Sequence, residues 1–482
     1  MSSTRYPRRA RKAAALVQIQ AARPQIAVPR ATLAGPPVVA LGVIAAVLAG
    51  VLAVGAPAIA VLIPLLGLLV LALTVAPCYW ALAAVVAAVC SRAGVAVGLL
   101  PGIAAYIDLP LAWGAFLFAA LTARSWSSKA QWVVLGVAGL GLTAAASGTL
   151  AGVSVVQSLF SYALLGAPFA LVAAILLAPP SVPQRKLLVT VALALAFIQV
   201  PITIAQAPQA THADQIQGTF VGSQAGAHLV GALCVVAALW IIARARTAFQ
   251  ALAAAPLLVV PFLSEANATL LAMPIGLLAM PVLTGPVRRL RKIVVIGVLA
   301  VLLGNIVVQG EYTLRVVEQT LRGEDIDKVQ AARQVEGQLT ESPTAFLLGA
   351  GPARTVGFSA LLSLDPLKDP DTPVRFLNLQ PSQMLLDLGG LSSGFSSFLH
   401  PASSALGVWG DLGVVGGLIY FALVGYLFLS ARKRRTPDAA GAAAALGLFI
   451  VLGVLFIWWE QTGFSLYVAL IAGLALADGY RS

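Results

Sequence analysis

The sequence predicts an all-α protein, a polytopic transmembrane helical bundle of about 12–14 spans with one large extracytoplasmic segment between late spans. Composition is the first observation: 60% of the 482 residues are hydrophobic and 10% are charged, whereas a soluble domain carries charge at about a quarter of its positions. The second observation is a series of apolar runs, each approaching the roughly 20 residues that cross a hydrocarbon core. One polar stretch, 310–404, interrupts them late in the chain.

These observations divide the chain into four regions. Residues 1–35 form a tail with seven basic and no acidic residues. No cleavage site is placed as a signal peptide needs, so we expect a retained cytoplasmic tail. Residues 36–309 form a transmembrane helical bundle, 310–404 an extracytoplasmic loop where substrate binding and catalysis would lie, and 405–482 the C-terminal transmembrane helices.

Fourteen ranges are apolar enough to be spans. They are 36–54, 57–75, 77–91, 109–123, 131–148, 156–178, 187–205, 221–242, 248–263, 268–284, 293–309, 407–429, 441–458 and 462–477. The apolar stretch 94–107 contains Pro101 and Gly102 and ends at Asp108. We interpret it as a re-entrant or interfacial piece, because a full span there would spoil the charge pattern described next.

The distribution of basic residues predicts the orientation. With the N-terminus in the cytoplasm, 22 of the 30 lysines and arginines fall on the cytoplasmic side, and the opposite orientation would reverse this bias. Both termini are then cytoplasmic and 310–404 is extracytoplasmic. The net charge of +12 therefore reflects topology and contact with anionic membrane lipid, and we expect no nucleic-acid partner.

Several kinds of site are not expected. Cys78, Cys90 and Cys234 lie in apolar runs, and their spacing matches neither a metal site nor a disulfide framework. The sequence contains no Walker loop, no dinucleotide fingerprint and no HExxH motif. We therefore expect neither a metal nor a cofactor, and any glycosyl or phosphoryl donor would have to arrive bound to lipid.

The polar segment divides into three parts. Residues 311–341 have helical spacing and mixed charge, broken near Gly323, and 346–358 (FLLGAGPARTVGF) form a Gly/Pro-rich turn. Residues 365–400 are predicted to be loop-like, since they contain four prolines. The segment holds 11 of the 18 acidic residues and seven basic ones, with Leu and Phe throughout, so we expect it to be folded.

His400 is the first candidate for chemistry. Pro401 follows it, and proline is favoured at the first helical position, which places His400 at the N-terminus of a helix through 407–429. The helix dipole would keep the imidazole neutral and able to accept a proton, and free backbone N–H groups there could hold a phosphate. The alternative is an inert, hydrogen-bonded histidine at the membrane interface.

Five arginines of the segment are candidates for binding phosphate oxygens, to which a guanidinium forms bidentate contacts. They are Arg315, Arg322, Arg333, Arg354 and Arg375. For the first three, a solvated helix face with partners one turn away is the favoured alternative. Arg354 lies in the Gly/Pro-rich turn, where backbone can approach a ligand closely.

Glu265 is a further candidate, between two spans on the extracytoplasmic side. A carboxylate near the membrane boundary is costly unless it is paired or hydrated. It marks either a functional site or simply a loop. His228, within a span, is interpreted as a packed and hydrogen-bonded residue.

Three passages are similar, in order and placement, to motifs of one known family. QIQGTFVGSQAGAHL (215–229) is similar to an R-x-x-G-T-F-x-x-P-N-x-L-A passage that opens a span. LLGAGPARTVGF (347–358) is similar to an L-G-x-G-P turn, and LHPASSALGVWGDLGVVGGLIYF (399–421) to a His-Asn passage followed by an acidic residue, here Asp411, and glycines. The chain thus resembles the O-antigen ligase/polymerase family of membrane glycosyltransferases.

The motifs depart from the family pattern at several positions. Gln215 stands where the family has arginine, Ser223 and Gln224 where it has Pro-Asn, and Pro401 where asparagine follows the histidine. A divergent member with a different glycan fits these departures, and so does one that has lost activity.

The resemblance implies a reaction on the outer face of the bacterial cytoplasmic (inner) membrane. A glycan would pass from undecaprenyl pyrophosphate to a hydroxyl of an acceptor glycan, lipid or protein, with no metal or other cofactor. His400 would act as the base or orient the acceptor, and Arg354 and Arg375 would hold the pyrophosphate. Further candidates for the site are Arg315, Arg322, Glu265 and Asp411.

Two hypotheses from other classes stay open. A lipid-linked oligosaccharide flippase or other polytopic transporter would also suit so many spans, but it needs charged residues at mid-membrane depth facing a cavity. Most charges here fall in loops or in 310–404, which favours chemistry at the membrane surface. A structural or regulatory protein with a degenerate site is the third possibility.

Overall fold

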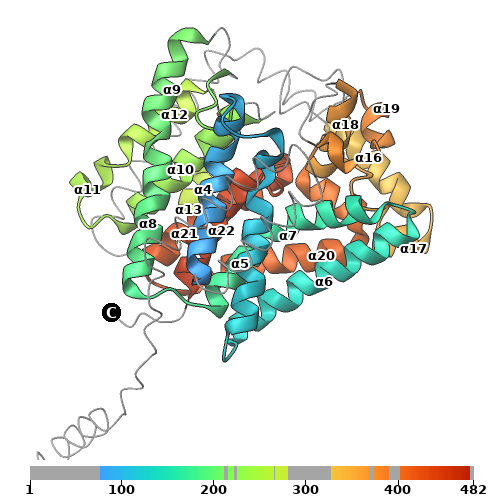
Figure 1. Cartoon of the computed structure of the whole chain (residues 1–482), viewed down its shortest axis with the longest axis horizontal. Coiled ribbons are helices and arrows are strands. Elements are labelled where there is room, and N and C mark those ends of the chain that lie inside the picture. The colour runs from blue at the N-terminus through green and yellow to red at the C-terminus, as the bar shows by residue number, and fades with distance from the viewer. Residues whose placement is uncertain are drawn as a thin grey trace, which may run out of the picture. The chain divides into compact units, whose positions relative to one another are not determined.

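The computed structural model describes residues 76–210, 215–221, 225–264, 266–280, 327–368, 374–389 and 402–477. Within these ranges 79% of the residues are helical and no strand occurs, which confirms the all-α fold class (Figure 1). Seven described helices are long and apolar enough to cross a membrane, and three shorter apolar helices accompany them. The chain therefore folds as a polytopic helical bundle.

The helices follow the predicted ranges closely. The long ones are α4 (Pro77–Ala96), α6 (Ser128–Leu150), α7 (Val155–Leu177), the run of α8 (Val182–Phe197), α9 (Gln199–Gln206) and η2 (Ala207–Gln209), α10 (Gly226–Arg244), α20 (Ser404–Lys433) and α21 (Pro437–Leu455). The three shorter ones are α5 (Asp108–Thr122), the run of α11 (Ala248–Leu252) and α12 (Ala255–Leu263), and α22 (Thr462–Leu476). Helix α13 (Asn267–Ala279) occupies a further predicted range. Helices thus occupy eleven of the fourteen ranges, while 36–54, 57–75 and 293–309 lie outside the described residues.

Short polar connections determine where several helices begin. The side chains of Ser127, Ser154 and Thr436 each accept a hydrogen bond of 3.2 Å from the backbone N–H three residues later. Each of these bonds satisfies one of the N–H groups that have no partner within the helix. The polar residues that separate apolar runs in the sequence are thus also the helix caps.

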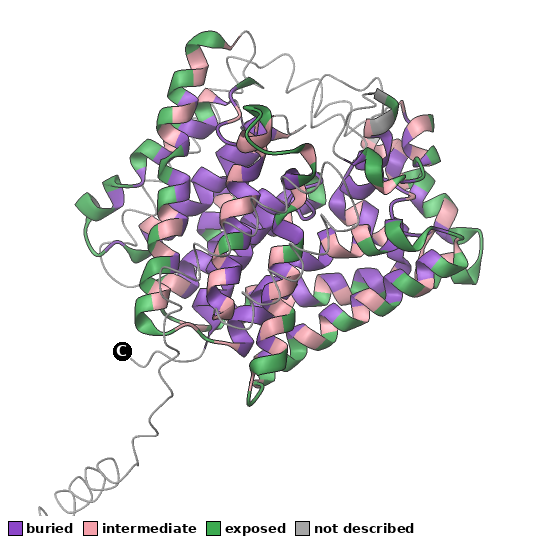
Figure 2. Ribbon diagram, in the orientation of Figure 1, coloured by how far each residue is buried: buried purple, intermediate pink, exposed green. Residues whose placement is uncertain are grey.

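The most deeply buried spans form the centre of the bundle. Within the most apolar stretch of each span, 89% of α10, 78% of α7 and 72% of α21 is buried, against 39% of α6 and of α8 with its continuation. Figure 2 shows this contrast between the central helices and the peripheral ones. Small residues allow the close approach: a Cβ at Gly441 would lie 2.4 Å from the Trp240 ring, in keeping with small-residue packing between membrane helices.

Successive helices alternate in direction, so their ends form two layers. We call one layer the loop end: it contains the connections 97–107, 151–154, 402–403 and 456–461 together with the described parts of 327–389. We call the other the basic end: it contains the connections 123–127, 178–181, 245–247 and 434–436. Ten of the sixteen described lysines and arginines lie at the basic end, with one of the nine described carboxylates, Asp438. This alternation matches the predicted charge pattern, and which end faces the cytoplasm stays a prediction.

The apolar stretch 94–107 does not form a span of its own. Helix α4 continues to Ala96, a turn follows, and the short helix η1 (Gly102–Tyr106) leads directly into α5. Leu99 and Ile103 are 81% and 54% exposed in the protein, as expected of a stretch that rests in a membrane interface. The prediction that 94–107 is not a full span is confirmed.

The polar segment is folded, as predicted, but it is more helical than its prolines indicate. It contains α16 (Asp327–Thr340), α17 (Pro343–Leu348), α18 (Phe358–Lys368), η4 (Arg375–Leu377) and α19 (Gln383–Asp387). The prediction of a loop over 365–400 is therefore wrong for 365–368 and for 383–387. Burial of Leu361, Leu362 and Leu364 holds α18 past Pro366, because packing overrides local propensity.

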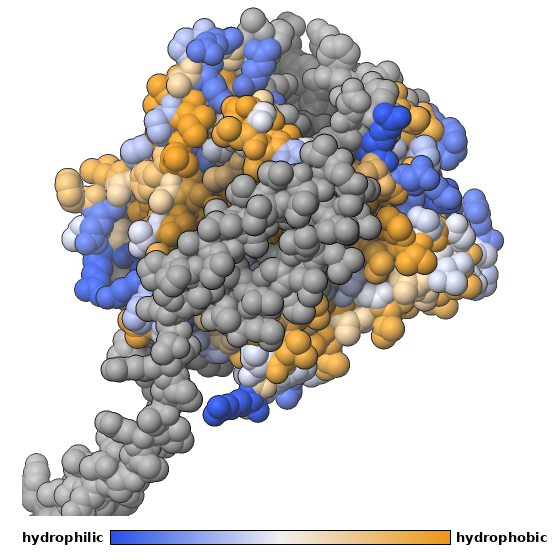
Figure 3. Space-filling model, in the orientation of Figure 1, coloured by the Kyte–Doolittle hydropathy of each residue, from blue (hydrophilic) through white to orange (hydrophobic). Residues whose placement is uncertain are grey.

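The segment adds a hydrophilic layer to the loop end. On the face drawn in Figure 3, hydrophilic residues gather around α16 and α17 and at the α5–α6 connection, whereas apolar residues are prominent along α6. Helices α16 and α17 both pack on α20, so the segment is attached to the spans.

A sharp bend in α20 receives the polar segment. Gly413 interrupts the helix with φ 64° and ψ −164°, a conformation essentially confined to glycine. A Cβ on Gly413 would lie 2.5 Å from the Gly349 nitrogen and 2.6 Å from the Leu347 carbonyl carbon and oxygen. The bend therefore depends on a missing side chain as well as on the positive φ.

Replacing Gly413 with alanine should destabilise the protein severely, because its Cβ meets backbone atoms that cannot move aside. We expect Gly413→Ala to lower the free energy of unfolding by about 3 kcal/mol or more, measured as a fall in Tm of the detergent-purified protein. Gly425→Ala in the same helix is the matched control. Nothing lies within 4 Å of a Cβ there, so Tm should hold or rise, and equal Tm values for the two variants would contradict the assignment.

Candidate functional site

The centre of the candidate site is the Gly/Pro-rich turn between α17 and α18, residues 349–357. Its backbone lies directly on the bend of α20. The Ala350 N–H donates to the Gly410 carbonyl (2.8 Å), and the Gly351 N–H to the Asp411 carbonyl (3.2 Å). Gly349 has φ 82°, and a Cβ on it would lie 2.4 Å from the Asp411 carbonyl carbon. Only glycine fits at a position so close to another backbone.

The carboxylate of Asp411 holds this turn from inside. Its Oδ2 accepts the Ala353 N–H (2.7 Å), while its Oδ1 accepts the N–H groups of Arg354 (3.2 Å) and Thr355 (2.9 Å) and the Thr355 hydroxyl (2.7 Å). Ala353 has φ 61°, which turns these N–H groups toward one point. The result is a backbone concavity of the kind that binds anions, and the bound anion is a side chain of the protein itself.

Two further buried groups secure the arrangement. The Ser147 hydroxyl of α6 donates to the Asp411 carbonyl at 2.7 Å. The amide of Gln157, fully buried on α7, donates to the Pro352 carbonyl (3.2 Å) and accepts the Gln380 N–H (2.8 Å). The turn is therefore attached to α6, α7 and α20, and the stretch around Gln380 lies against it.

Glu460 is a second buried carboxylate at the loop end, only 2% exposed. It accepts the N–H groups of Phe358 (2.8 Å) and Ser359 (3.3 Å), the first two residues of α18, and the hydroxyl of Ser404 (3.2 Å). A carboxylate at a helix N-terminus is favourable because it faces the unpaired N–H groups and the positive end of the dipole. Burial raises the pKa of Glu460 to about 7, and the nearby charge of Asp411 adds to the rise.

Sequence reasoning missed Glu460. The signal is present, since WWEQTG (458–463) places one carboxylate in the short connection between two apolar ranges, where a charge is costly unless paired. Its partners, Phe358 and Ser404, are far away in the sequence, so the role of Glu460 is visible only in the fold.

Arg354 and Arg375 both lie in the polar segment at the loop end. The Arg354 guanidinium donates to the Gln380 side chain, and the Ser382 hydroxyl donates to the Arg354 carbonyl (2.8 Å). Arg375 is exposed at the start of η4, a few residues before Gln380. The fold thus brings the loop that carries Arg375 against the turn that carries Arg354.

Two details predicted for this region are corrected by the structure. The N–H groups of the Arg354 turn are bonded to Asp411, so close backbone approach here serves the protein's own helix rather than a ligand. The helix expected to begin beside His400 begins at Ser404, because the Ser403 hydroxyl caps it by accepting the Leu406 N–H at 3.4 Å. Asp411, predicted as a site residue, lies at the site as the residue that holds the turn.

Several predicted residues lie outside the described ranges. They are His400, Arg315, Arg322 and Glu265. Of the other residues considered, Arg333 is exposed on α16, and His228 packs beside Trp458 with ring centroids 6.3 Å apart. The packing predicted for His228 is therefore confirmed, and its predicted hydrogen bond stays a prediction.

Lys328 attaches α16 to the spans. Its ammonium donates to the carbonyls of Ala402 (3.5 Å) and Leu455 and lies 4.7 Å from the centre of the Phe456 ring. Burial lowers the pKa of Lys328 to about 8. Lys328 thereby joins the polar segment to the start of α20 and to the end of α21, which both lie at the loop end.

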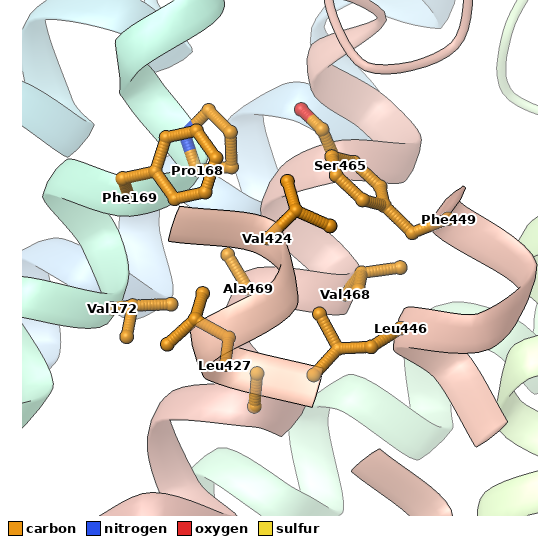
Figure 4. A pocket seen from close by; sticks show the side chains of 11 residues that line it. Pro168, Phe169, Val172, Val424, Leu427, Leu446, Phe449, Ser465, Val468 and Ala469 are labelled. Atoms are coloured by element: carbon orange, nitrogen blue, oxygen red, sulfur yellow. The ribbon is translucent and has the colours of Figure 1, made fainter. Parts of the chain in front are cut away.

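Two small cavities lie among the described spans. One lies between α7, α20, α21 and α22, lined by apolar side chains and Ser465 (Figure 4), and its volume is about 10 Å³. A second of about 10 Å³ lies between α6, α7 and the turn, beside Ser161 and Asp411. Each has room for about one water molecule, so neither holds a sugar.

Within the described residues no cluster of three or more His, Cys, Asp or Glu side chains could hold a metal ion. Comparison with protein-family models gives no match for this chain, and comparison with curated proteins gives none either.

Removing the charge of Asp411 should loosen the turn without unfolding the spans. Asp411→Asn keeps one acceptor oxygen and leaves buried N–H groups unbonded, at a cost of about 2–4 kcal/mol. Limited trypsin digestion should then cleave after Arg354 at least tenfold faster than in wild type. Asp387→Asn, whose side chain is exposed beside Gln383, is the control and should cleave at the wild-type rate; an unchanged rate for Asp411→Asn would show that the turn does not depend on the carboxylate.

The raised pKa of Glu460 predicts a stability that depends on pH. The unfolded chain loses this proton near pH 4.5, whereas the folded protein keeps it until about pH 7, so the contribution of Glu460 to the free energy of unfolding falls across that window, by up to about 3 kcal/mol. Glu460→Gln removes this term. We expect the Tm difference, variant minus wild type, to become more positive between pH 5 and pH 8, with Glu336→Gln on the exposed face of α16 as control. A constant difference would contradict the assigned pKa.

Proposed function

We propose that this protein is a membrane glycosyltransferase of the O-antigen ligase/polymerase type. It transfers or polymerises a glycan from undecaprenyl pyrophosphate to an acceptor hydroxyl on the outer face of the cytoplasmic membrane. In this proposal the loop end is the outer face and both termini are cytoplasmic. The acceptor is a glycan, a lipid or a protein.

One observation carries the proposal. Two of the three passages that resemble the family, 347–358 and 399–421, bond to each other through Asp411 and the backbone around Gly413. They are far apart in the sequence, so their union in one structural unit supports a shared ancestry of these motifs over coincidence. That unit carries Arg354 at the polar end of the spans.

The chemistry follows from the residue types. The acceptor hydroxyl attacks the anomeric carbon, the bond from that carbon to the pyrophosphate oxygen breaks, and the pyrophosphate keeps the electron pair. Its developing negative charge needs fixed positive charge, which Arg354 and Arg375 supply, with Arg315 and Arg322 as further candidates. His400 takes the proton of the hydroxyl.

The turn contributes rigidity in this proposal rather than ligands. Because Asp411 occupies the backbone concavity, the phosphate is held by side chains alone. A guanidinium on a turn attached to three helices keeps its position with little reorganisation. Asp411 and Glu460 are thus positioning residues for Arg354.

A flippase or other transporter is the alternative. It requires a polar path at mid-membrane depth. The cavity among α7, α20, α21 and α22 is apolar and about 10 Å³, and the Asp, Lys, Arg and His side chains of the described spans lie toward their ends. These observations favour chemistry at the membrane surface.

The test is transfer from a purified undecaprenyl-pyrophosphate-linked glycan to an acceptor, without metal or nucleotide. Wild type should transfer, His400→Ala should lose at least 100-fold in rate, and Arg354→Ala should lose about 10–100-fold. Arg333→Ala, an exposed arginine of the same segment, is the control and should stay within about twofold.

Two outcomes would overturn parts of the proposal. Absence of transfer by wild type with a competent acceptor, together with lipid-linked glycan crossing in proteoliposomes, would establish the transporter instead. Full activity of both His400→Ala and Arg354→Ala would remove the site assignment while leaving the reaction in place.

A further inference from the structure

The basic end carries a cluster of exposed cations that the protein does not neutralise with its own described carboxylates. We call it the basic rim: Lys186 at the start of α8, Arg246 after α10, and Arg432, Lys433 and Arg435 at the end of α20. All five side chains are exposed. They come from three helix ends that meet around the first turn of α21.

The neighbouring charged residues separate into those bonded within the protein and those that are not. Asp438, on α21, accepts from Arg185 of α8 (2.6 Å) and from the Trp240 indole (3.3 Å), and lies 3.4 Å from Arg244 of α10. Both of its oxygens are therefore in use. Arg434 donates to the Ala475 carbonyl at 2.8 Å, at the last turn of α22.

These bonds fix the geometry of the rim. The ion pairs of Asp438 join the ends of α8, α10 and α21, and Arg434 joins α20 to α22. The Arg432 guanidinium lies 5.7 Å from the Phe428 ring centre, which holds it at the side of α20. The five exposed cations are thus presented by a rigid base.

Carboxylates are scarce at this end of the chain. Asp438 is the one acidic residue among the described residues of the basic end, and the sequence adds only Asp478 just beyond α22. The described residues of the loop end carry eight carboxylates and six basic residues. Among the described residues of the basic end, no carboxylate besides Asp438 is present to balance the charge of the rim.

Exposed aromatic and apolar side chains flank these cations. Trp126, in the α5–α6 connection, and Trp132, near the start of α6 with Lys129, are 41% and 62% exposed, and Phe249, three residues after Arg246, is 82% exposed. Tryptophan and phenylalanine so placed, next to Lys and Arg, are typical of side chains at the head-group level of a bilayer. The anions that reach the rim are therefore those of the bilayer surface.

We propose that the basic rim binds the phosphate groups of anionic glycerophospholipids, the class of phosphatidylglycerol and cardiolipin. Arg432 and Arg435 offer bidentate contacts to phosphate oxygens, and Lys186 and Lys433 add compact charge beside them. The rim draws these lipids from a mixed bilayer in preference to zwitterionic lipids. This inference is independent of the proposed glycan transfer.

The experiment uses the full chain in nanodiscs or detergent, with phosphatidylglycerol and phosphatidylcholine of identical acyl chains as the probes. Native mass spectrometry should show phosphatidylglycerol bound on the order of tenfold more than phosphatidylcholine at low salt. The preference should shrink as ionic strength rises from about 0.05 to 0.5 M, since salt screens exposed charges. Inorganic phosphate at equal concentration should not displace the lipid.

Two triple variants separate charge from structure. Arg432→Gln with Lys433→Gln and Arg435→Gln should abolish most of the preference while Tm in phosphatidylcholine stays at the wild-type value. Arg432→Lys with Lys433→Arg and Arg435→Lys retains the charge and should retain the preference. Equal binding of both lipids by wild type, an undiminished preference in the glutamine variant, or displacement by inorganic phosphate would each overturn the proposal.

Discussion

The arrangement of the loop end depends on one buried carboxylate that occupies an anion-binding concavity made of backbone. Asp411 accepts three successive N–H groups of the turn at 353–355, and this contact forms only because α20 bends at Gly413. At this bend a side chain at residue 413 would meet the backbone of Leu347 and Gly349. The bend of α20, the Asp411 carboxylate and the turn at 353–355 therefore stabilise one another, and the conformation of each would be energetically unfavourable without the other two.

Glu460 is a second buried side chain that accepts backbone N–H groups of the polar segment, here at the start of α18. From the connection between α21 and α22 it accepts the first two N–H groups of α18, so a residue of the membrane domain completes a helix of the polar segment. Lys328 does the reverse, since a cation of the polar segment binds carbonyls at the ends of the spans. Buried charges are costly unless they are fully bonded, and here their partners come from elements far apart in the chain. The polar segment is consequently packed and hydrogen-bonded as a part of the helical bundle.

In this arrangement the backbone of the turn and the Arg354 side chain have different roles, although both belong to one short stretch of sequence. The backbone groups of LGAGPART serve the internal anion Asp411, and the Arg354 side chain remains for an external one. A glycine-rich turn beside an arginine usually suggests that the backbone N–H groups and the guanidinium bind phosphate together. In this protein the backbone is already occupied, so fixed cations must recognise the ligand. At the opposite end Asp438 is bonded to Arg185, Arg244 and Trp240, and we propose that the exposed cations of the basic rim bind anionic lipid.

The sequence by itself determined the fold class, eleven of the helical ranges, the alternation of the charged ends and the position of the turn. These follow from local properties, namely apolar length, charge placement and the conformational preferences of glycine and proline, each of which acts over a few residues. Only the tertiary structure decided that Asp411 holds the turn, that Glu460 belongs to the site, that α18 continues past Pro366 and that α20 begins at Ser404. Those outcomes depend on partners tens to hundreds of residues away, and a buried hydrogen bond or a missing Cβ has no signature in the local sequence.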